Sequence, residues 1–330
     1  MSDSLLVIMN YEIASGLRLL NQMVYRGKLL VRFGVCFGVC FVCFGVDAFV
    51  CMVYFLYLCR QIQNYHNNVT MKTLVLTGGS SGIGRATCVL FAQRGWQVFE
   101  LSRHGKTETH IMHIYCDVCH EESVRDAVAQ VLAQTDHIDV VISNAGFGIS
   151  GAVEFTTIDE AKKQFDVNFF GAVRVVQAVL PQLRKQHGGR IIFTSSVAAA
   201  LSIPYQAFYS SCKAALNALA LALQNEVRTY GISVCVLMPG DVATGFTAAR
   251  EKSEQGAAVY PHIRSAVSAM EKDEKNGLSP ETIARQFYRI AVCRRPKPQY
   301  ISGALYKLFM VIDWLLPKRW VNGIIGRLYA

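Results

Sequence analysis

TGGSSGIGRA, residues 77–86, joins a short apolar run to an amphipathic stretch and decides how the chain folds. Gly78, Gly82 and Gly84 give it the pattern G-x-x-x-G-x-G at a strand-to-helix turn. Because glycine lacks a Cβ, the backbone N–H groups of such a turn can approach a pyrophosphate at the positive end of the helix. The stretch therefore predicts a βα unit that binds a dinucleotide.

The same glycines allow two other interpretations. Gly79 to Ala86 nearly match the phosphate-binding loop G-x-x-x-x-G-K-[ST], but Arg85 and Ala86 replace the lysine and the Mg²⁺-binding hydroxyl. Nucleotide hydrolysis is therefore disfavoured. From this stretch alone, a glycine-rich turn without any ligand stays open.

Outward from this turn, short apolar runs alternate with amphipathic stretches. Strands are expected at 72–77, 97–102, 111–115, 138–143, 189–195 and 232–238, and helices at 83–94, 121–134, 159–186, 208–229 and 280–293. This alternation predicts βαβ units and an α/β fold with a doubly wound parallel sheet. Residues 246–278 form a long charged insertion, where α/β proteins place substrate loops.

The end of the second expected strand, FELSRHGK at 99–106, bears on the choice of dinucleotide. An acid at this point would bind a ribose 2′-hydroxyl, whereas an arginine accommodates a 2′-phosphate. Arg103 follows the strand, Arg85 can lie nearby, and Glu100 sits inside the strand. We therefore expect NADP(H) rather than NAD(H), the alternative being that Arg103 is a solvated loop residue.

Four further motifs follow in order: SNAG at 143–146, FTSSVA at 193–198, YSSCK at 209–213 and PGDVAT at 239–244. With the glycine turn, they make residues 72–245 resemble the short-chain dehydrogenase/reductase family, most closely its hydroxysteroid and retinol dehydrogenase branch. The resemblance implies a Rossmann-like fold and an NADP(H)-dependent oxidoreductase for a lipophilic ketone, aldehyde or secondary alcohol such as a steroid-, retinoid- or acyl-like compound. It fades over 246–330 and is absent from 1–70.

The resemblance implies a catalytic group of Asn168, Ser196, Tyr209 and Lys213. Tyr209 would be the general acid/base and Lys213 would lower its pKa and hold the ribose, while Ser196 would bind the substrate oxygen and Asn168 a relay water. Bringing a phenol pKa from about 10 to about 7 takes roughly 4 kcal/mol. An exposed i, i+4 pair supplies only about 0.2–0.5 kcal/mol, so Lys213 must act in a partly desolvated site. Ser196 lacks the G-x-S-x-G elbow of an acyl-transfer nucleophile.

The resemblance also implies the cofactor contacts. They are Gly78, Ser80, Ser81, Gly82, Ile83, Gly84, Arg103, Asp117, Val118, Asn144, Ala145, Gly146, Tyr209, Lys213, Pro239, Gly240, Val242 and Thr244. One departure is Ser143, where the family commonly has asparagine. No metal site is expected. The alternative function is a non-catalytic NADP(H)-binding regulator or scaffold, against which the intact group of four catalytic residues argues.

Cys116-Asp117-Val118-Cys119-His120 matches the C-x-x-C-H pattern of haem attachment. Neither an exported chain nor a second pair of zinc ligands supports a haem or metal role, while a dithiol role stays open. On the dinucleotide interpretation this stretch closes the third strand. The resemblance then implies that Asp117 and Val118 hold the adenine and that the two cysteines are bystanders.

Residues 1–70 form a hydrophobic N-terminal extension before a single catalytic domain at 71–330. Residues 33–59 are a candidate membrane-spanning segment, since roughly 20 apolar residues suffice. The basic residues that precede the segment would, however, send the domain across the membrane, away from a cytosolic cofactor. The alternative is that 1–70 are dispensable and the domain begins at Met71. The eleven cysteines lack a disulfide-framework spacing, which indicates a reducing compartment and a cytoplasmic domain.

The tail, residues 291–330, carries seven basic residues against a single acid, Asp313, in a chain of net charge +9. Its apolar stretch at 304–316 is too short to span a bilayer. We expect it to pack on the domain, on a second copy in a homodimer, or on a membrane surface that supplies a lipophilic substrate. Nucleic acid is not expected, because the basic residues alternate with large apolar ones.

Overall fold

The computed structural model describes residues 71–253 and 255–329, so the candidate membrane segment at 33–59 lies outside the described residues. A seven-stranded sheet with every pairing parallel forms the centre, in the order β3-β2-β1-β4-β6-β7-β9. Its strands are β1 Thr73–Thr77, β2 Gln97–Ser102, β3 Ile111–Tyr115, β4 Val140–Ser143, β6 Gly189–Thr194, β7 Ile232–Met238 and β9 Gln299–Ile301. The predicted parallel sheet is confirmed.

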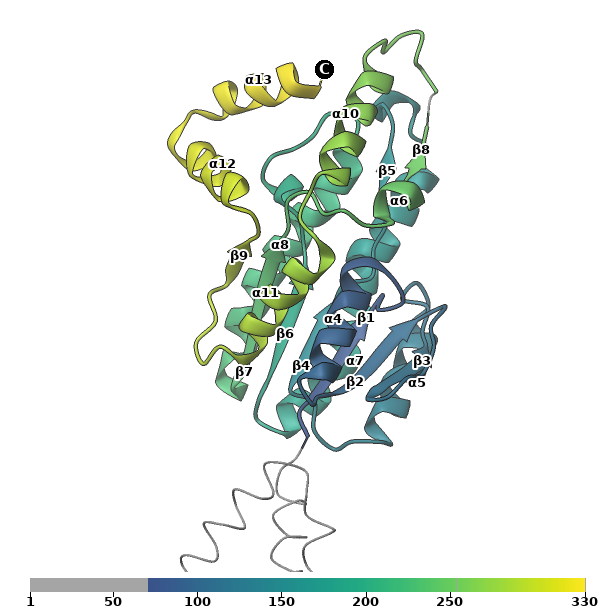
Figure 1. The fold of residues 1–330 in the computed structure, drawn as a ribbon, viewed down its shortest axis with the longest axis vertical. Coiled ribbons are helices and arrows are strands. Elements are labelled where there is room, and N and C mark those ends of the chain that lie inside the picture. Colours follow the sequence, from purple (N-terminus) through teal and green to yellow (C-terminus); the bar gives the residue numbers. More distant parts are fainter. Residues whose placement is uncertain (1–70, 254, 330) are drawn as a thin grey trace, which may run out of the picture. The chain divides into compact units, whose positions relative to one another are not determined.

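Helices cover both faces of the sheet (Figure 1). They are α4 Gly82–Gln93, α5 Glu121–Leu132, α7 Gly171–Lys185, α8 Ala207–Val227 and α11 Pro280–Val292, while α6 Ile158–Phe165 packs on α8. One buried apolar layer joins the sheet to α5, α7 and α8, and a second joins it to α4 and α11. Burial on both faces is why the strands read as continuous Val, Ile and Leu runs, and the arrangement is the expected doubly wound α/β fold.

Three features differ from the expectation. The expected helix at 159–186 is interrupted by a π-helical turn, Asp166–Phe170, between α6 and α7. The charged insertion is not a plain loop, because it holds α9 Phe246–Ala249, α10 Ile263–Lys275 and β8 Glu251–Lys252, which pairs with β5 Ile149–Ser150. A seventh strand, β9, adds to β7, and three residues are too few to show a period of two.

The tail forms two helices, α12 Ala304–Leu315 and α13 Lys318–Tyr329. α12 agrees with the apolar stretch expected at 304–316, whereas α13 was not expected. Short 3₁₀ turns cover Val153–Phe155, Val197–Ala199 and Arg228–Tyr230. None of the helices within 71–253 and 255–329 is long and apolar enough to cross a bilayer.

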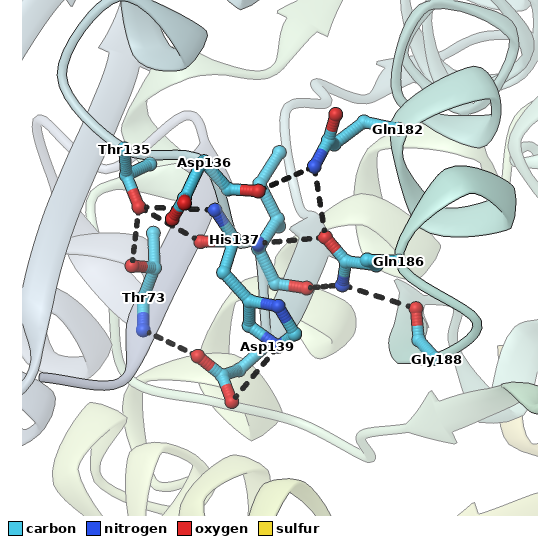
Figure 2. Close-up of polar contacts among 9 residues, drawn as sticks. Thr73, Thr135, Asp136, His137, Asp139, Gln182, Gln186 and Gly188 are labelled. Carbon is cyan, nitrogen blue, oxygen red and sulfur yellow. Dashed lines mark hydrogen bonds and ion pairs between the residues drawn. The ribbon is translucent and has the colours of Figure 1, made fainter. Parts of the chain in front are cut away.

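The amino end of the sheet is closed by a polar network on the segment that leads into β4 (Figure 2). The side chain of Gln186 pairs with Ile138 as a strand would, accepting from its N–H (3.1 Å) and donating to its carbonyl (2.6 Å). Beside it, the N–H of Thr73 donates to Asp139 Oδ2 (2.8 Å), and Gln182 donates to the carbonyl of Asp136 (2.5 Å). The backbone groups of the buried residues Thr73 and Ile138 are thus satisfied by partly buried side chains, as expected of a structural contact.

Candidate active site

The glycine turn lies at the carboxyl end of β1 and has a backbone that only glycine adopts easily. Gly78 and Gly82 have φ values of +71° and +53°. A Cβ on Gly84 would overlap the carbonyl oxygen of Gly78, and one on Gly78 would lie 2.9 Å from the Cα of Ala145. No side chain caps the first turn of α4, although Ser81 occupies the N-cap position. Its N–H groups are therefore left for an anion, so the residues present fit a pyrophosphate.

The motifs after β4 and β7 meet this turn. Asn144 Nδ2 donates to the carbonyl of Gly78 (3.1 Å), and its Oδ1 accepts from Thr194 Oγ1 (3.2 Å). The side chain of Thr244 lies 3.4 Å from where a Cβ of Gly82 would stand. Stretches more than 150 positions apart in sequence thus converge at one edge of the sheet, where open α/β sheets bind ligands.

Around the end of β2, some of the charged side chains already bind neighbouring residues. Glu100 is 2 % exposed; its Oε1 accepts from the N–H of Gly79 (3.0 Å) and its Oε2 lies 2.6 Å from His113 Nδ1. Arg85 donates to both carboxylate oxygens of Glu108 (2.8 and 2.6 Å). Arg103 is exposed and makes no ion pair with any residue that the structure describes. Of the two expected arginines, only Arg103 keeps an unpaired guanidinium.

The C-x-x-C-H stretch turns sharply after β3. Asp117 Oδ1 accepts from the N–H of Cys119 (3.0 Å), and Val118 packs against Gly171, where a Cβ would come within 2.8 Å of its side chain. Both cysteines are free thiols. Burial raises the pKa of Cys116 and of Cys119 to about 12 each, and the nearby carboxylates of Asp117 and, for Cys119, Asp166 add to the effect. Thiols held protonated in this way are poor nucleophiles, which argues against the dithiol alternative.

The helix α8 brings Tyr209 and Lys213 to the same edge. Lys213 is 4 % exposed, its Nζ donates to the carbonyl of Thr194 (2.8 Å) and lies 5.7 Å from the centre of the Tyr209 ring. Burial lowers the pKa of Lys213 and raises the pKa of Tyr209, while a hydrogen bond from Ser196 acts on Tyr209 in the opposite direction. The lysine is thus desolvated, as the phenol chemistry requires, whereas burial by itself moves the pKa of Tyr209 away from neutrality.

Asn168 sits in the π-helical turn and is 1 % exposed. Its Nδ2 donates to the carbonyls of Phe147 (2.8 Å) and Gln164 (3.0 Å), but its Oδ1 has no partner among the described residues. A Cβ on Gly146 would overlap that Oδ1 and lie 3.7 Å from Lys213 Nζ. The two groups therefore lie on the same side of Gly146, where no side chain separates them.

Sequence reasoning missed three residues beside this group. The ring of Phe246 lies 5.8 Å from that of Tyr209. Arg250, 5 % exposed, is ion-paired with Glu274, which also accepts from Thr247 Oγ1 (2.5 Å). The Nε and Nη1 atoms of Arg250 have no hydrogen-bond partner within the described chain. Only the charged composition of the insertion hinted at this pair.

The expected cofactor loop, residues 239–244, is held from three sides. The N–H of Val197 donates to the carbonyl of Pro239 (3.0 Å), and the N–H of Leu278 donates to the carbonyl of Asp241 (2.8 Å). From the tail, the ring of Tyr306 covers Gly240 so closely that a Cβ there would overlap it, and the Tyr306 hydroxyl donates to Asp241 Oδ2. Burial raises the pKa of Asp241. The tail therefore contacts the expected cofactor loop directly.

Comparison with known proteins identifies the class. The family described as short chain dehydrogenase matches residues 72–255, and this chain belongs to that family. It is a pyridine-nucleotide-dependent oxidoreductase, and the fold of its family binds NAD(P)(H). Within 71–253 and 255–329, no cluster of three or more metal-ligating side chains accompanies the site.

Two relatives and one solved structure are similar to most of this chain. The 3-ketodihydrosphingosine reductase of Bacteroides thetaiotaomicron is 37% identical over 78% of this chain and 98% of its own. The NADPH-dependent 3-dehydrocapnine reductase of Ornithobacterium rhinotracheale is 28% identical over 77% of this chain and 96% of its own. Among solved structures, a short-chain dehydrogenase from Streptomyces avermitilis is similar with a TM-score of 0.67 and 28% identity, covering 74% of this chain and 93% of that one.

Proposed function

We propose that this chain uses NADPH to reduce the carbonyl of a lipophilic ketone or aldehyde, with Asn168, Ser196, Tyr209 and Lys213 as the catalytic group. One observation carries the proposal. Tyr209 and Lys213 converge with the unpartnered Oδ1 of Asn168 at the carboxyl edge of the sheet. Homologues that act on ketones support the reaction class. The reverse oxidation of a secondary alcohol would use the same groups.

Each side chain has one task in this proposal. When bound, the dihydronicotinamide supplies a hydride to the carbonyl carbon. Tyr209 Oη gives its proton to the substrate oxygen, which Ser196 Oγ also binds, so that negative charge does not build up on that oxygen. The charge of Lys213 Nζ favours the phenolate that Tyr209 becomes. A water bound by Lys213 Nζ and Asn168 Oδ1 would then take a proton from solvent and pass one to the Tyr209 phenolate.

NADP(H) is proposed over NAD(H) because of the side chains around the end of β2. Glu100 is occupied by Gly79 and His113, so it does not face outward to bind a ribose 2′-hydroxyl. Arg103 is exposed there and unpaired within the described chain, as a 2′-phosphate ligand should be. The NADPH-dependent relative supports the same choice. The remaining expected contacts, from Gly78 to Thr244, are proposed unchanged.

The decisive experiment measures NADPH oxidation with steroid, retinoid, 3-oxoacyl and sphingoid 3-ketones and with small ketones. We expect turnover with one of the lipophilic groups, and loss of turnover by a factor of about 10² to 10⁴ in Tyr209→Phe with NADPH binding kept. The alternative, a non-catalytic NADP(H)-binding regulator, predicts binding of NADPH without turnover on every ketone. If NADPH binding were lost in Tyr209→Phe, the acid/base role given to this residue would be wrong.

We also propose that residues 71–330 form a cytoplasmic catalytic domain for which 1–70 are dispensable. The family match begins at residue 72, which supports that boundary. A chain starting at Met71 should fold and bind NADPH as the full chain does. Aggregation of that shorter chain, or loss of NADPH binding, would contradict the proposal. A homodimer is proposed as well, to be tested by sedimentation.

A further inference from the structure

The helices α12 and α13, residues 304–329, carry an unusual number of exposed large apolar side chains. Their exposed fractions run from 49% at Ile324 to 82% at Trp314. The set is Leu305, Leu308, Val311, Trp314, Leu315, Trp320, Ile324 and Leu328. We call this set the tail patch. Exposed large apolar side chains gathered on two successive helices mark a site of interaction, because leaving them in water is costly.

α12 is apolar on both sides. Its inner side anchors the helix, since Tyr306 and Met310 pack against the main core. Its outer side presents Leu305, Leu308 and Leu315, each more than half exposed, which none of the described residues covers. A helix that is apolar all round is normally buried, so we expect the outer side to have a cover beyond the described residues.

The charge of the tail indicates what covers the outer side of α12. Between Leu305 and Leu328 lie Lys307, Lys318, Arg319 and Arg327, and the only acid, Asp313, is already paired with Lys318 (2.6 Å). A second copy of the chain would bring the same positive excess against itself. An anionic lipid surface complements both features, since apolar side chains enter the acyl boundary while lysine and arginine meet the headgroups. Two tryptophans on the patch suit the interface between water and hydrocarbon.

The position of the patch links it to catalysis. α12 and α13 lie at the end of the sheet that also carries α10, β5 and β8 (Figure 1). Tyr306 joins α12 directly to Gly240 and Asp241 of the expected cofactor loop. A bilayer that receives the patch would therefore lie beside the carboxyl edge of the sheet, where a lipophilic ketone must enter.

We propose that residues 304–329 dock the enzyme on an anionic bilayer and that membrane-dissolved ketone reaches the site there. The substrate part rests on the function proposed above; the docking part does not. Two of the three tryptophans of the chain, Trp314 and Trp320, report on the patch, while Trp96 is 4% exposed in the core. Fluorescence of the full chain is thus a local probe, even if residues 1–70 also bind lipid.

The test adds vesicles of phosphatidylcholine, with or without phosphatidylglycerol, carrying brominated acyl chains. With the anionic vesicles we expect a blue shift and quenching of tryptophan emission. Both should disappear in a Trp314→Phe, Trp320→Phe variant. Leu308→Glu with Leu315→Glu should lower vesicle binding through the patch about tenfold or more, whereas Val153→Glu, an exposed valine elsewhere, should not. Equal quenching by neutral vesicles would remove the electrostatic part of the proposal.

Two outcomes would overturn docking altogether. The chain could bind vesicles without quenching of these tryptophans, or the double glutamate variant could be quenched like the parent. A second copy is the cover if two results coincide. Tryptophan emission would be at short wavelength without lipid, and in sedimentation the parent would be a dimer and the double glutamate variant a monomer. On the kinetic side, the double variant should lose rate on vesicle-dissolved ketone and keep its rate on a water-soluble one. Absence of all turnover would refute the proposed function while leaving the fluorescence result intact.

Discussion

The two ends of the sheet treat their buried polar groups in opposite ways. At the amino end, Gln186 satisfies both backbone groups of Ile138, and Asp139 takes the N–H of Thr73. At the carboxyl end, Asn168 Oδ1 and two nitrogens of Arg250 have no partner in the described chain. Unsatisfied buried groups cost stability, so a fold keeps them where a ligand can complete them. The difference separates structural polarity from functional polarity.

The largest effect should come from breaking the buried ion pair at the carboxyl end. Glu274→Gln leaves Arg250 with an uncompensated charge, and we expect the free energy of unfolding to fall by about 3 kcal/mol. Urea unfolding of the parent and the variant measures it. The matched control is Glu108→Gln, which breaks the exposed pair with Arg85 and should cost less than about 1 kcal/mol. Equal losses in both would mean that burial of the Arg250 pair has no energetic consequence.

The second largest effect should be a loss of turnover when the unpartnered side-chain carbonyl of Asn168 is removed. Asn168→Ala takes away one end of the proposed water site, and we expect kcat to fall about 10²-fold. The KM for NADPH should stay within about twofold, because no cofactor contact is assigned to this residue. Steady-state kinetics separates the two parameters. A rise in KM with kcat unchanged would instead place Asn168 in cofactor binding.

At the opposite end, Gln186→Ala should show the reverse pattern. It removes two hydrogen bonds to Ile138 and leaves a partly buried backbone segment unsatisfied, so unfolding should become easier by about 2 kcal/mol. We expect kcat and KM to be unchanged well below the unfolding midpoint. A clear change in kcat would show that the amino end is coupled to the site after all.

The smallest effect concerns cofactor choice. Arg103→Ala should raise the KM for NADPH about tenfold, as expected for loss of one charge-assisted hydrogen bond, and leave the KM for NADH unchanged. Arg85→Ala is the matched control, because this arginine is engaged by Glu108. If Arg85→Ala has the larger effect, the phosphate would bind on the α4 side of the turn instead.

The sequence predicted those features that depend on residues close to one another in the chain. The first strand and the turn after it were placed within a residue, because alternating apolar runs and glycines report on their own hydrogen bonding. The expected helix at 159–186 was right about its extent but not its break. The π-helical turn that holds Asn168 has no distinctive residues in DVNFF, so nothing local marks its wider i, i+5 hydrogen bonding.

The sequence by itself determined the parallel sheet and the glycine turn, since each has a local pattern. The residues proposed for proton transfer came from the family resemblance of the ordered motifs. Only the tertiary structure decided that Asn168 and Lys213 both lie beside Gly146, and that Tyr306 bonds to Asp241 from 65 positions away. Contacts of that separation depend on how the layers pack, and no local periodicity encodes them. The same packing left one side of α12 uncovered by the described residues.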